Sequence, residues 1–493
     1  MTDLADFSID AAGAGLRRGD FTATDLVNAT IDRAAITESH LHAYLTLDQD
    51  KARSAAAAAD EAFAAGDDHG PLQGIPIALK DNMTTRGMET TAGSKILSGY
   101  VPPYDATVVE RLRSQHAVII GKTNLDEYAM GSSTENSAFG PTRNPWNTDL
   151  VPGGSSGGSA AAVSVGSALG AFGSDTGGSI RQPASLCGLV GIKPTYGVVS
   201  RYGLIAFASS LDQIGPFARS VADAATLLEG VAGFDIHDAT SYRGDTPDIS
   251  SLLDRGVAGM RIGIVKELSG EGIDPEVDAA CKTMFDALSD AGANVTEVSL
   301  PATEYALSAY YLIAPAEASA NLARFDGVRY GLRVDGETTE DMMAKTRAEG
   351  FGPEVIRRIL LGTYALSAGY YEAFYGQAQK VRTLVRNDFA AAYENVDVLV
   401  SPTSPTTAFG IGERTEDPLS MYYADVCTIA SNLAGDPAGS VPIGLDRSGL
   451  PIGFQIMAPA LSEAQLFRVA AEVERLAGFD TRPALATSEV LPA

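Results

Sequence analysis

Cysteine and histidine are scarce in this sequence, and their scarcity excludes several kinds of site. Only three cysteines, Cys187, Cys281 and Cys427, occur among 493 residues, and they lie far apart. An odd and sparse set of cysteines predicts reduced thiols rather than a disulfide framework. The chain has no Cys-x-x-Cys and no His-x-x-x-His pair, so we expect no protein-bound metal.

Long apolar segments are also missing. No apolar run reaches the roughly 18 residues that a membrane-spanning helix needs. The first residues, Met-Thr-Asp-Leu-Ala-Asp, contain no basic patch followed by an apolar stretch, so they predict no signal peptide. Together with the reduced cysteines, these absences predict a cytoplasmic protein with no membrane contact.

Positive charge is the third shortage. The chain carries 62 Asp and Glu residues against 36 Lys and Arg, a net charge of −26, and only nine residues are lysines. Excess acid with little lysine is typical of a halophilic protein, in which a strongly charged surface preserves solubility; an ordinary acidic cytosolic enzyme is the alternative. The charge argues against extensive direct contact with nucleic acid, whose phosphates are bound by basic patches, although a partner could supply that contact.

Nucleotide-binding loops are incomplete. The sequence Gly121-Lys122-Thr123 follows an apolar run and resembles the end of a P-loop. That motif also needs a glycine five residues earlier, where this chain has His116. No Gly-x-Gly-x-x-Gly follows a strand pattern either, so we expect no ATP site in this chain.

Strand and helix patterns alternate along the chain and predict an α/β layered fold. Short apolar runs predict strands over residues 75–79, 117–120, 261–265, 294–298, 397–402 and 451–456. Helical patterns cover residues 107–113, 159–169, 274–291 and the stretch from 462 onward.

The organisation predicts one large domain over residues 1–493. Residues 1–65 read as a helical N-terminal part, and residues 70–220 hold glycine- and serine-rich loops suited to catalysis. Residues 305–395 are largely helical and rich in tyrosine. No internal repeat or low-complexity linker divides these parts.

The loops contain a candidate catalytic lysine and two candidate serines. Lys80 ends the run 74–80, Ser155 lies in Gly-Gly-Ser-Ser-Gly-Gly-Ser at 153–159, and Ser179 lies in Asp-Thr-Gly-Gly-Ser-Ile-Arg at 175–181. A serine hydroxyl needs a base before it becomes a nucleophile. None of the five histidines lies in such a loop, whereas a buried lysine loses its charge easily enough to act as the base. Glycines let backbone N–H groups approach a developing oxyanion.

All three segments resemble the amidase-signature family of hydrolases, and the resemblance covers nearly the whole chain. It continues through Gly-Leu-Val-Gly-Ile-Lys-Pro-Thr at 188–195 and Asp-Gln-Ile-Gly-Pro at 212–216. The resemblance implies the fold of that family, a central mixed β-sheet covered by helices on both faces, with helical elaborations. It also implies roles for Ser179 as the nucleophile, Ser155 as a bridging serine often joined by a cis peptide, and Lys80 as the base. The oxyanion hole would be formed by the backbone N–H groups of Thr176, Gly177, Gly178 and Ser179.

Within this family the chain resembles the A subunits of tRNA-dependent amidotransferases. The matching stretches are residues 124–135, 316–331, 357–367 and 432–435, together with Asp425. Free glutamine carries a carboxylate and an ammonium, and Arg suits a carboxylate because its fork binds both oxygens. The resemblance implies that Arg358 binds the carboxylate, with the neighbouring Arg357 as the alternative, and that Asp425 binds the ammonium. The remaining pocket residues would be Gly131, Ser132, Tyr310 and Tyr311.

The resemblance implies a glutaminase that forms an acyl-enzyme on Ser179 and supplies ammonia to the B and C subunits of a heterotrimer. There, misacylated Glu-tRNA(Gln) or Asp-tRNA(Asn) would be amidated in a reaction that uses ATP and Mg²⁺, so the chain itself needs no cofactor. A stand-alone amidase acting on a small aliphatic or aryl amide is the alternative, and glutamine dependence separates the two. A catalytically dead scaffold is a third hypothesis, against which the intact Lys80, Ser155 and Ser179 argue.

Overall fold

One mixed sheet of eleven strands organises residues 3–486, which are the residues that the computed structural model describes. In spatial order the strands are β1 (Tyr44–Leu47), β3 (Val118–Thr123), β2 (Pro76–Lys80), β4 (Gly170–Asp175), β6 (Gln213–Ala218), β5 (Val190–Lys193), β10 (Ala438–Leu445), β11 (Pro451–Met457), β9 (Val398–Pro402), β7 (Arg261–Val265) and β8 (Asn294–Val298). The pairs β2–β3, β2–β4, β7–β8 and β7–β9 are parallel, and the other pairs are antiparallel.

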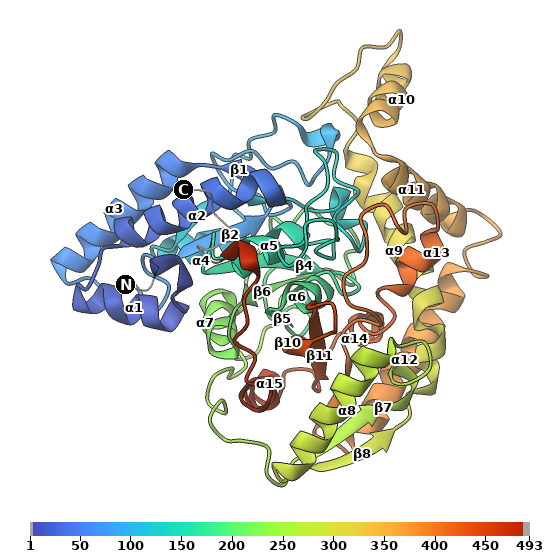
Figure 1. The fold of residues 1–493 in the computed structure, drawn as a ribbon. Coiled ribbons are helices and arrows are strands. Elements are labelled where there is room, and N and C mark those ends of the chain that lie inside the picture. Colours follow the sequence, from blue (N-terminus) through green and yellow to red (C-terminus); the bar gives the residue numbers. More distant parts are fainter. Residues whose placement is uncertain (1–2, 487–493) are drawn as a thin grey trace.

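Fifteen α-helices accompany the sheet within the described residues. They are α1 (Ile9–Arg18), α2 (Ala23–Leu41), α3 (Gln49–Ala65), α4 (Thr107–Ser114), α5 (Gly157–Val165), α6 (Arg181–Cys187), α7 (Val221–Val231), α8 (Pro275–Asp290), α9 (Ala306–Asn321), α10 (Thr339–Gly350), α11 (Pro353–Leu366), α12 (Tyr375–Tyr393), α13 (Pro418–Tyr423), α14 (Ile429–Ala434) and α15 (Glu463–Ala477). Helices α1–α3 and helices α9–α12 lie at opposite sides of the molecule (Figure 1). Each of these described helices is too short or too polar to cross a membrane.

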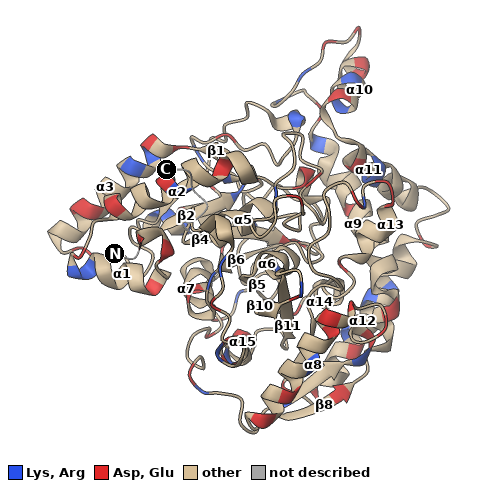
Figure 2. Cartoon of the chain, in the orientation of Figure 1, with Lys and Arg blue, Asp and Glu red and all other residues tan. Residues whose placement is uncertain are grey.

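The two faces of the sheet are buried by different helices. Side chains of a strand alternate between faces, and in β9 the side chains of Val398 and Val400 join one apolar cluster, which includes residues of α8 and α15. Leu399 lies between them and joins a second cluster with residues of α9 and α12. The predicted mixed sheet with helices on both faces is therefore confirmed. Charged residues lie mainly on the outer helices and loops, whereas the central strands carry few of them (Figure 2).

The predicted elements agree with the structure where the apolar pattern is clear. Strands β7 and β8 match the predicted residues, α4 extends one residue beyond its predicted end, and α8 is one residue shorter than predicted at each end. The helix predicted over 159–169 is too long, because Gly166 takes the left-handed conformation (φ 79°) and ends α5. The N-terminal part is not wholly helical, because β1 separates α2 from α3.

Besides β1, the strands β4, β5, β6 and β10 were not predicted. In these four, small residues and glycine interrupt the apolar pattern. Gly173 in β4 shows the reason. A Cβ at this position would lie 2.6 Å from the ring of Phe217 and 2.8 Å from the hydroxyl of Ser156. Close packing around the serine loop therefore requires glycine in a strand.

Candidate active site

The candidate site lies where two parallel strands end. Strands β2 and β4 are neighbours, with Leu79 opposite Phe172, so their carboxyl ends meet at one edge of the sheet. Lys80 is the last residue of β2, and Asp175 is the last residue of β4. The loop after Asp175 carries Ser179 and leads into α6, whereas Ser155 closely precedes α5. The topology thus brings three segments that are distant in sequence to one place.

The ammonium group of Lys80 is surrounded by hydroxyl groups. Its Nζ donates to the Oγ atoms of Ser155 at 2.7 Å, Ser156 at 2.8 Å and Ser174 at 2.9 Å. The lysine side chain is fully buried. Burial lowers the pKa of Lys80 to about 7, against the opposing effect of the more distant Asp126, Asp175 and Asp212. Lys80 is thus able to exchange a proton with a serine hydroxyl near neutral pH.

The carboxylate next to Lys80 points away from it. Strand alternation predicts this direction for Asp81, whose Oδ1 lies 3.1 Å from Nζ of Lys122. The other oxygen of Asp81 accepts from the amide and hydroxyl of Thr91 at 2.8 and 2.6 Å. Among the described residues, Lys80 therefore has no directly paired carboxylate that would keep it charged.

Ser155 occupies a tightly enclosed turn. The Gly154–Ser155 peptide bond is cis, as the family resemblance implies. A Cβ on Gly154 would lie 2.3 Å from Oδ2 of Asp126 and 2.5 Å from the backbone nitrogen of Ser133. The amide of Gly154 donates to Oε1 of Gln182 at 2.9 Å. These contacts enclose the turn so closely that only glycine fits before Ser155.

Ser179 is the candidate nucleophile and retains slight exposure. Its relative exposure is 8%, whereas Lys80 and Ser155 are fully buried. Within the described residues, no hydrogen bond joins the hydroxyls of Ser179 and Ser155. The proton path from Ser179 through Ser155 to Lys80 therefore stays a prediction, with its last step, Ser155 to Lys80, in hydrogen-bond contact.

The loop before Ser179 presents unused amide groups. In the described part of the chain, the backbone N–H groups of Thr176, Gly177, Gly178 and Ser179 donate no hydrogen bond. Other contacts hold this loop: the Thr176 hydroxyl donates to Asp212 at 2.7 Å, and the Gly177 carbonyl accepts from Thr428 at 2.6 Å. Buried N–H groups are rarely left unpaired in proteins. Four consecutive N–H groups without an acceptor therefore indicate a site that can bind an oxyanion.

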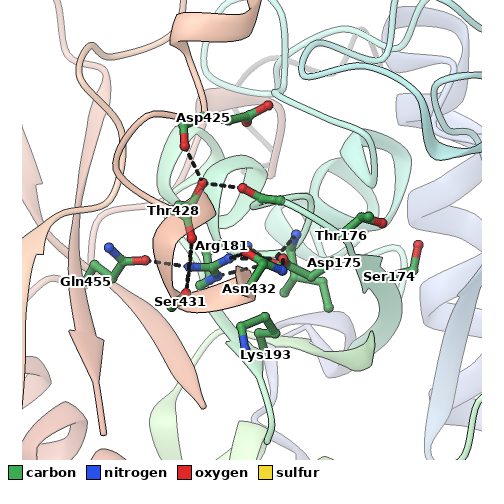
Figure 3. Close-up of polar contacts among 12 residues, drawn as sticks. Ser174, Asp175, Thr176, Arg181, Lys193, Asp425, Thr428, Ser431, Asn432 and Gln455 are labelled. Atoms are coloured by element: carbon green, nitrogen blue, oxygen red, sulfur yellow. Dashed lines mark hydrogen bonds and ion pairs between the residues drawn. The ribbon is translucent and has the colours of Figure 1, made fainter. Parts of the chain in front are cut away.

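A buried arginine joins both ends of this loop. Arg181 lies at the start of α6, and its Nη2 and Nε lie 3.0 and 3.1 Å from the two carboxylate oxygens of Asp175. Its Nη1 also donates to the Ser431 hydroxyl at 2.8 Å and the Gln455 side chain at 2.7 Å (Figure 3). Asn432 donates to Asp175 at 2.8 Å. Because the ion pair between Arg181 and Asp175 joins the two ends of the loop, it holds the amides of residues 176–179 in place.

Arg358 lies in an aromatic part of the site. Its guanidinium carbon is 5.3 Å from the ring centres of both Tyr311 and Tyr422 and 5.5 Å from that of Phe207. Its Nε donates to Glu354 at 2.7 Å, one helical turn earlier on α11. Within the described residues its two Nη atoms donate no hydrogen bond. The guanidinium fork is therefore held at one edge, and its end is available to a ligand.

Arg357 has a different environment from Arg358, although both pair with Glu354. The side chain of Arg357 is 44% exposed, whereas that of Arg358 is 3% exposed. Both arginines line a cavity of about 140 Å³, which Gly131 also lines. Of the two, only the Arg358 guanidinium lies over tyrosine rings, although Arg357 also hydrogen-bonds to the Tyr422 side chain.

Asp425 is a buried acid with one available oxygen. Its Oδ2 accepts from the Ser132 hydroxyl at 2.5 Å, whereas its Oδ1 accepts no hydrogen bond from the residues described. Burial raises the pKa of Asp425 to about 7, against the lowering effects of Ser132 and Arg358. Tyr310 lies against the Ser179 loop, because a Cβ on Gly177 would come within 2.7 Å of its ring. Tyr310 thus packs against the loop that carries the candidate nucleophile.

Sequence reasoning missed several residues of the site. Ser156 and Ser174 also accept hydrogen bonds from Lys80, but serines in glycine-rich segments give no distinguishing signal. Glu354 could have been found, because residues four apart on a helix are neighbours and Glu354 precedes Arg358 at that spacing. Thr428 has no local signal, since its partner Gly177 is 251 residues away in the sequence.

Comparison with known proteins identifies the family of this chain. The amidase family model matches residues 25–467. The chain is 59% identical over 479 residues to the A subunit of glutamyl-tRNA(Gln) amidotransferase from Acidothermus cellulolyticus, covering 96% of this chain and 95% of the relative. The corresponding protein of Thermobifida fusca is 57% identical over 96% of each chain.

Solved structures give the same result. The crystal structure of the A subunit of glutamyl-tRNA(Gln) amidotransferase from Thermotoga maritima matches with a TM-score of 0.82 and 41% identity, covering 98% of this chain and 99% of that one. A peptide amidase from Stenotrophomonas maltophilia matches with a TM-score of 0.83 and 33% identity over 98% and 99% of the two chains. The resemblance to the amidase-signature family is thereby confirmed, and the chain belongs to the amidase family.

Proposed function

We propose that this chain is the glutaminase component of a tRNA-dependent amidotransferase. The observation that carries the proposal is the combination of an available arginine fork at Arg358 and an available carboxylate oxygen at Asp425 around one catalytic loop. Glutamine carries the complementary pair, a carboxylate and an ammonium, beside the side-chain amide to be cleaved. Binding a neutral amide does not require two buried charged groups. The Arg358 guanidinium and the Asp425 carboxylate each keep polar atoms without a hydrogen-bond partner in the described part of the chain.

The proposed reaction begins at Ser179. Lys80, in its neutral form, takes the proton of Ser179 through Ser155 while Ser179 attacks the side-chain amide carbon of glutamine. The N–H groups of residues 176–179 stabilise the resulting oxyanion. The proton returns to the departing nitrogen, which leaves as ammonia. The γ-glutamyl ester on Ser179 is then hydrolysed by water, and glutamate leaves.

We propose that the ammonia is used by partner subunits rather than by this chain. Relatives with more than half of their residues identical are named as A subunits, which supports partners corresponding to the B and C subunits of a heterotrimer. Their names also favour Glu-tRNA(Gln) over Asp-tRNA(Asn) as the acceptor. ATP, Mg²⁺ and tRNA would then be bound by the partners, in a cytoplasm whose high salt suits a net charge of −26.

The test compares glutamine with a small aliphatic amide as substrates of the purified chain, with and without the proteins that co-purify with it at high salt. We expect ammonia release from glutamine to exceed release from the simple amide. A preference for the simple amide would instead indicate a stand-alone amidase. Covalent labelling of Ser179 by a serine-directed phosphonate excludes a catalytically dead scaffold.

A further inference from the structure

Thr428 is a buried threonine that links the catalytic loop to the acidic end of the pocket. It directly precedes α14, and its Oγ1 lies 2.6 Å from the carbonyl oxygen of Gly177 and 3.0 Å from that of Asp425 (Figure 3). The Asp425 carbonyl already accepts from the backbone N–H groups of Thr428 and Ile429, at 3.0 and 3.2 Å. A hydroxyl has one proton to donate, so this proton belongs to the shorter contact with Gly177.

The hydrogen bond to Gly177 sets the direction of the next amide. The Gly177–Gly178 peptide is trans, so its carbonyl and the N–H of Gly178 point in opposite directions. Holding the carbonyl toward Thr428 therefore turns the Gly178 N–H away from Thr428. Gly178 has a φ of 144°, and a Cβ there would lie 2.2 Å from Oγ1 of Thr428. The hydroxyl thus occupies the space beside this glycine that a side chain would need.

The position of Thr428 is itself fixed from two directions. Its carbonyl oxygen accepts from Nη1 of Arg181 at 3.0 Å and from the Ser431 hydroxyl at 3.0 Å. The same turn carries Asp425, whose carboxylate lies three residues earlier. A single short segment therefore holds both the candidate ammonium ligand and the contact that orients the oxyanion loop.

We propose that Thr428 is a positioning residue that orients the Gly177–Gly178 peptide so that the Gly178 N–H stabilises the oxyanion. The proposal rests on the function proposed above, in which the amides of residues 176–179 form the oxyanion hole. Thr428 touches no reacting atom. Loss of its hydroxyl frees the peptide to rotate, which weakens stabilisation of the transition state more than substrate binding.

The test measures kcat and KM of the full chain for Thr428→Val, Thr428→Ala and Thr428→Ser, on glutamine and on a small aliphatic amide. Removing an oxyanion donor outright costs about 10²–10³-fold in kcat, so a misdirected donor should cost about 10- to 100-fold. We expect that loss for the valine and alanine variants on both substrates, with KM changed less than about twofold. Thr428→Ser keeps the hydroxyl and should stay within about threefold of the parent chain.

A matched control separates this role from general packing. Thr37 in α2 is also buried, and its hydroxyl donates to the carbonyl of Arg33 at 2.9 Å, far from the loop in sequence. Thr37→Val removes an equivalent hydrogen bond and should lower thermal stability without changing kcat. Equal effects of the Thr37 and Thr428 valine variants on kcat would overturn the proposal, as would a Thr428→Ser variant as slow as Thr428→Val.

The rate of Ser179 phosphonylation provides a readout that does not depend on the natural substrate. A fluorophosphonate develops negative charge on its phosphoryl oxygen, so Thr428→Val and Thr428→Ala should react more slowly than the parent chain by the same factor as kcat. If the parent chain does not prefer glutamine but Thr428→Val still slows phosphonylation, the proposed function fails and the role of Thr428 stands. Unchanged phosphonylation in both variants overturns the role of Thr428 alone. A parent chain that neither cleaves an amide nor reacts at Ser179 overturns both.

Discussion

Replacement of Arg358 by alanine tests how the proposed glutaminase selects its substrate. In the structure this guanidinium is almost completely buried and contacts two tyrosine rings, and its Nη atoms have no acceptor among residues 3–486. The Arg358→Ala change removes the group that we propose binds the glutamine carboxylate. It also leaves Glu354 with one fewer cation in a site where its side chain is 10% exposed.

The expected loss of glutamine affinity follows from the burial of Arg358. Truncating one member of a buried, hydrogen-bonded charge pair costs about 2–5 kcal/mol, largely because the remaining charge stays unpaired. At roughly 1.4 kcal/mol per tenfold change, this predicts a rise in KM for glutamine of about 30-fold to several thousand-fold. Glu354 would then repel the substrate carboxylate, which favours the upper half of this range. A neutral amide has no carboxylate, so its kcat/KM should change less than about threefold.

The assay is ammonia release under initial-rate conditions, with glutamine and a small aliphatic amide measured on the same preparations. Arg357→Ala is the matched control, because Arg357 also pairs with Glu354 but its side chain is 44% exposed. Exposed ion pairs contribute about 0–1 kcal/mol, so we expect at most about a fivefold change in KM for this variant. Adding Glu354→Gln to Arg358→Ala should recover part of the lost affinity.

Two results would refute this reasoning. Equal losses of kcat/KM for glutamine and for the simple amide would mean that Arg358 supports the fold or the chemistry and does not recognise a carboxylate. A larger effect of Arg357→Ala than of Arg358→Ala on the KM for glutamine would place the carboxylate at the exposed arginine.

Three further predictions concern the catalytic residues and the partner. The pKa of Lys80, lowered to about 7 in the unliganded chain, predicts that kcat/KM falls as pH drops below 7, because the ammonium form cannot accept a proton. A pH profile of kcat/KM that stays flat through 7 would contradict this. Lys80→Ala, Ser155→Ala and Ser179→Ala should each remove nearly all glutaminase activity while leaving the thermal unfolding transition intact, and the Lys80→Ala/Ser179→Ala double variant should be little worse than either single variant. If the activity losses of the two single variants multiplied in the double variant, the residues would act independently. The isolated chain, with its net charge of −26, should not bind tRNA in an anisotropy titration at any salt concentration, whereas the complex with its partner should; saturable binding by the isolated chain would disprove that division of roles.

The catalytic chemistry could be predicted from the sequence because it depends on residue types in short loops. Lys80, Ser155 and Ser179 lie in glycine-rich segments whose composition already suits close backbone approach, and the absence of a nearby histidine points to lysine as the base. The strands β7 and β8 were predictable for a similar reason, since their apolar pattern is local. Strands such as β4 were missed because their glycines serve contacts with residues far along the chain.

The side chains available for catalysis, and the kinds of substrate group that they suit, could therefore be predicted from the sequence. Their environments depend on the fold. Consecutive residues on a helix point about 100° apart, so the fold places Arg358 among tyrosines and Arg357 at the surface. The fold likewise buries Lys80 among three serine hydroxyls and leaves four loop amides without acceptors among the residues described. Burial and hydrogen bonding arise between segments that meet only when the chain is folded, as when Thr428 reaches Gly177 across 251 residues.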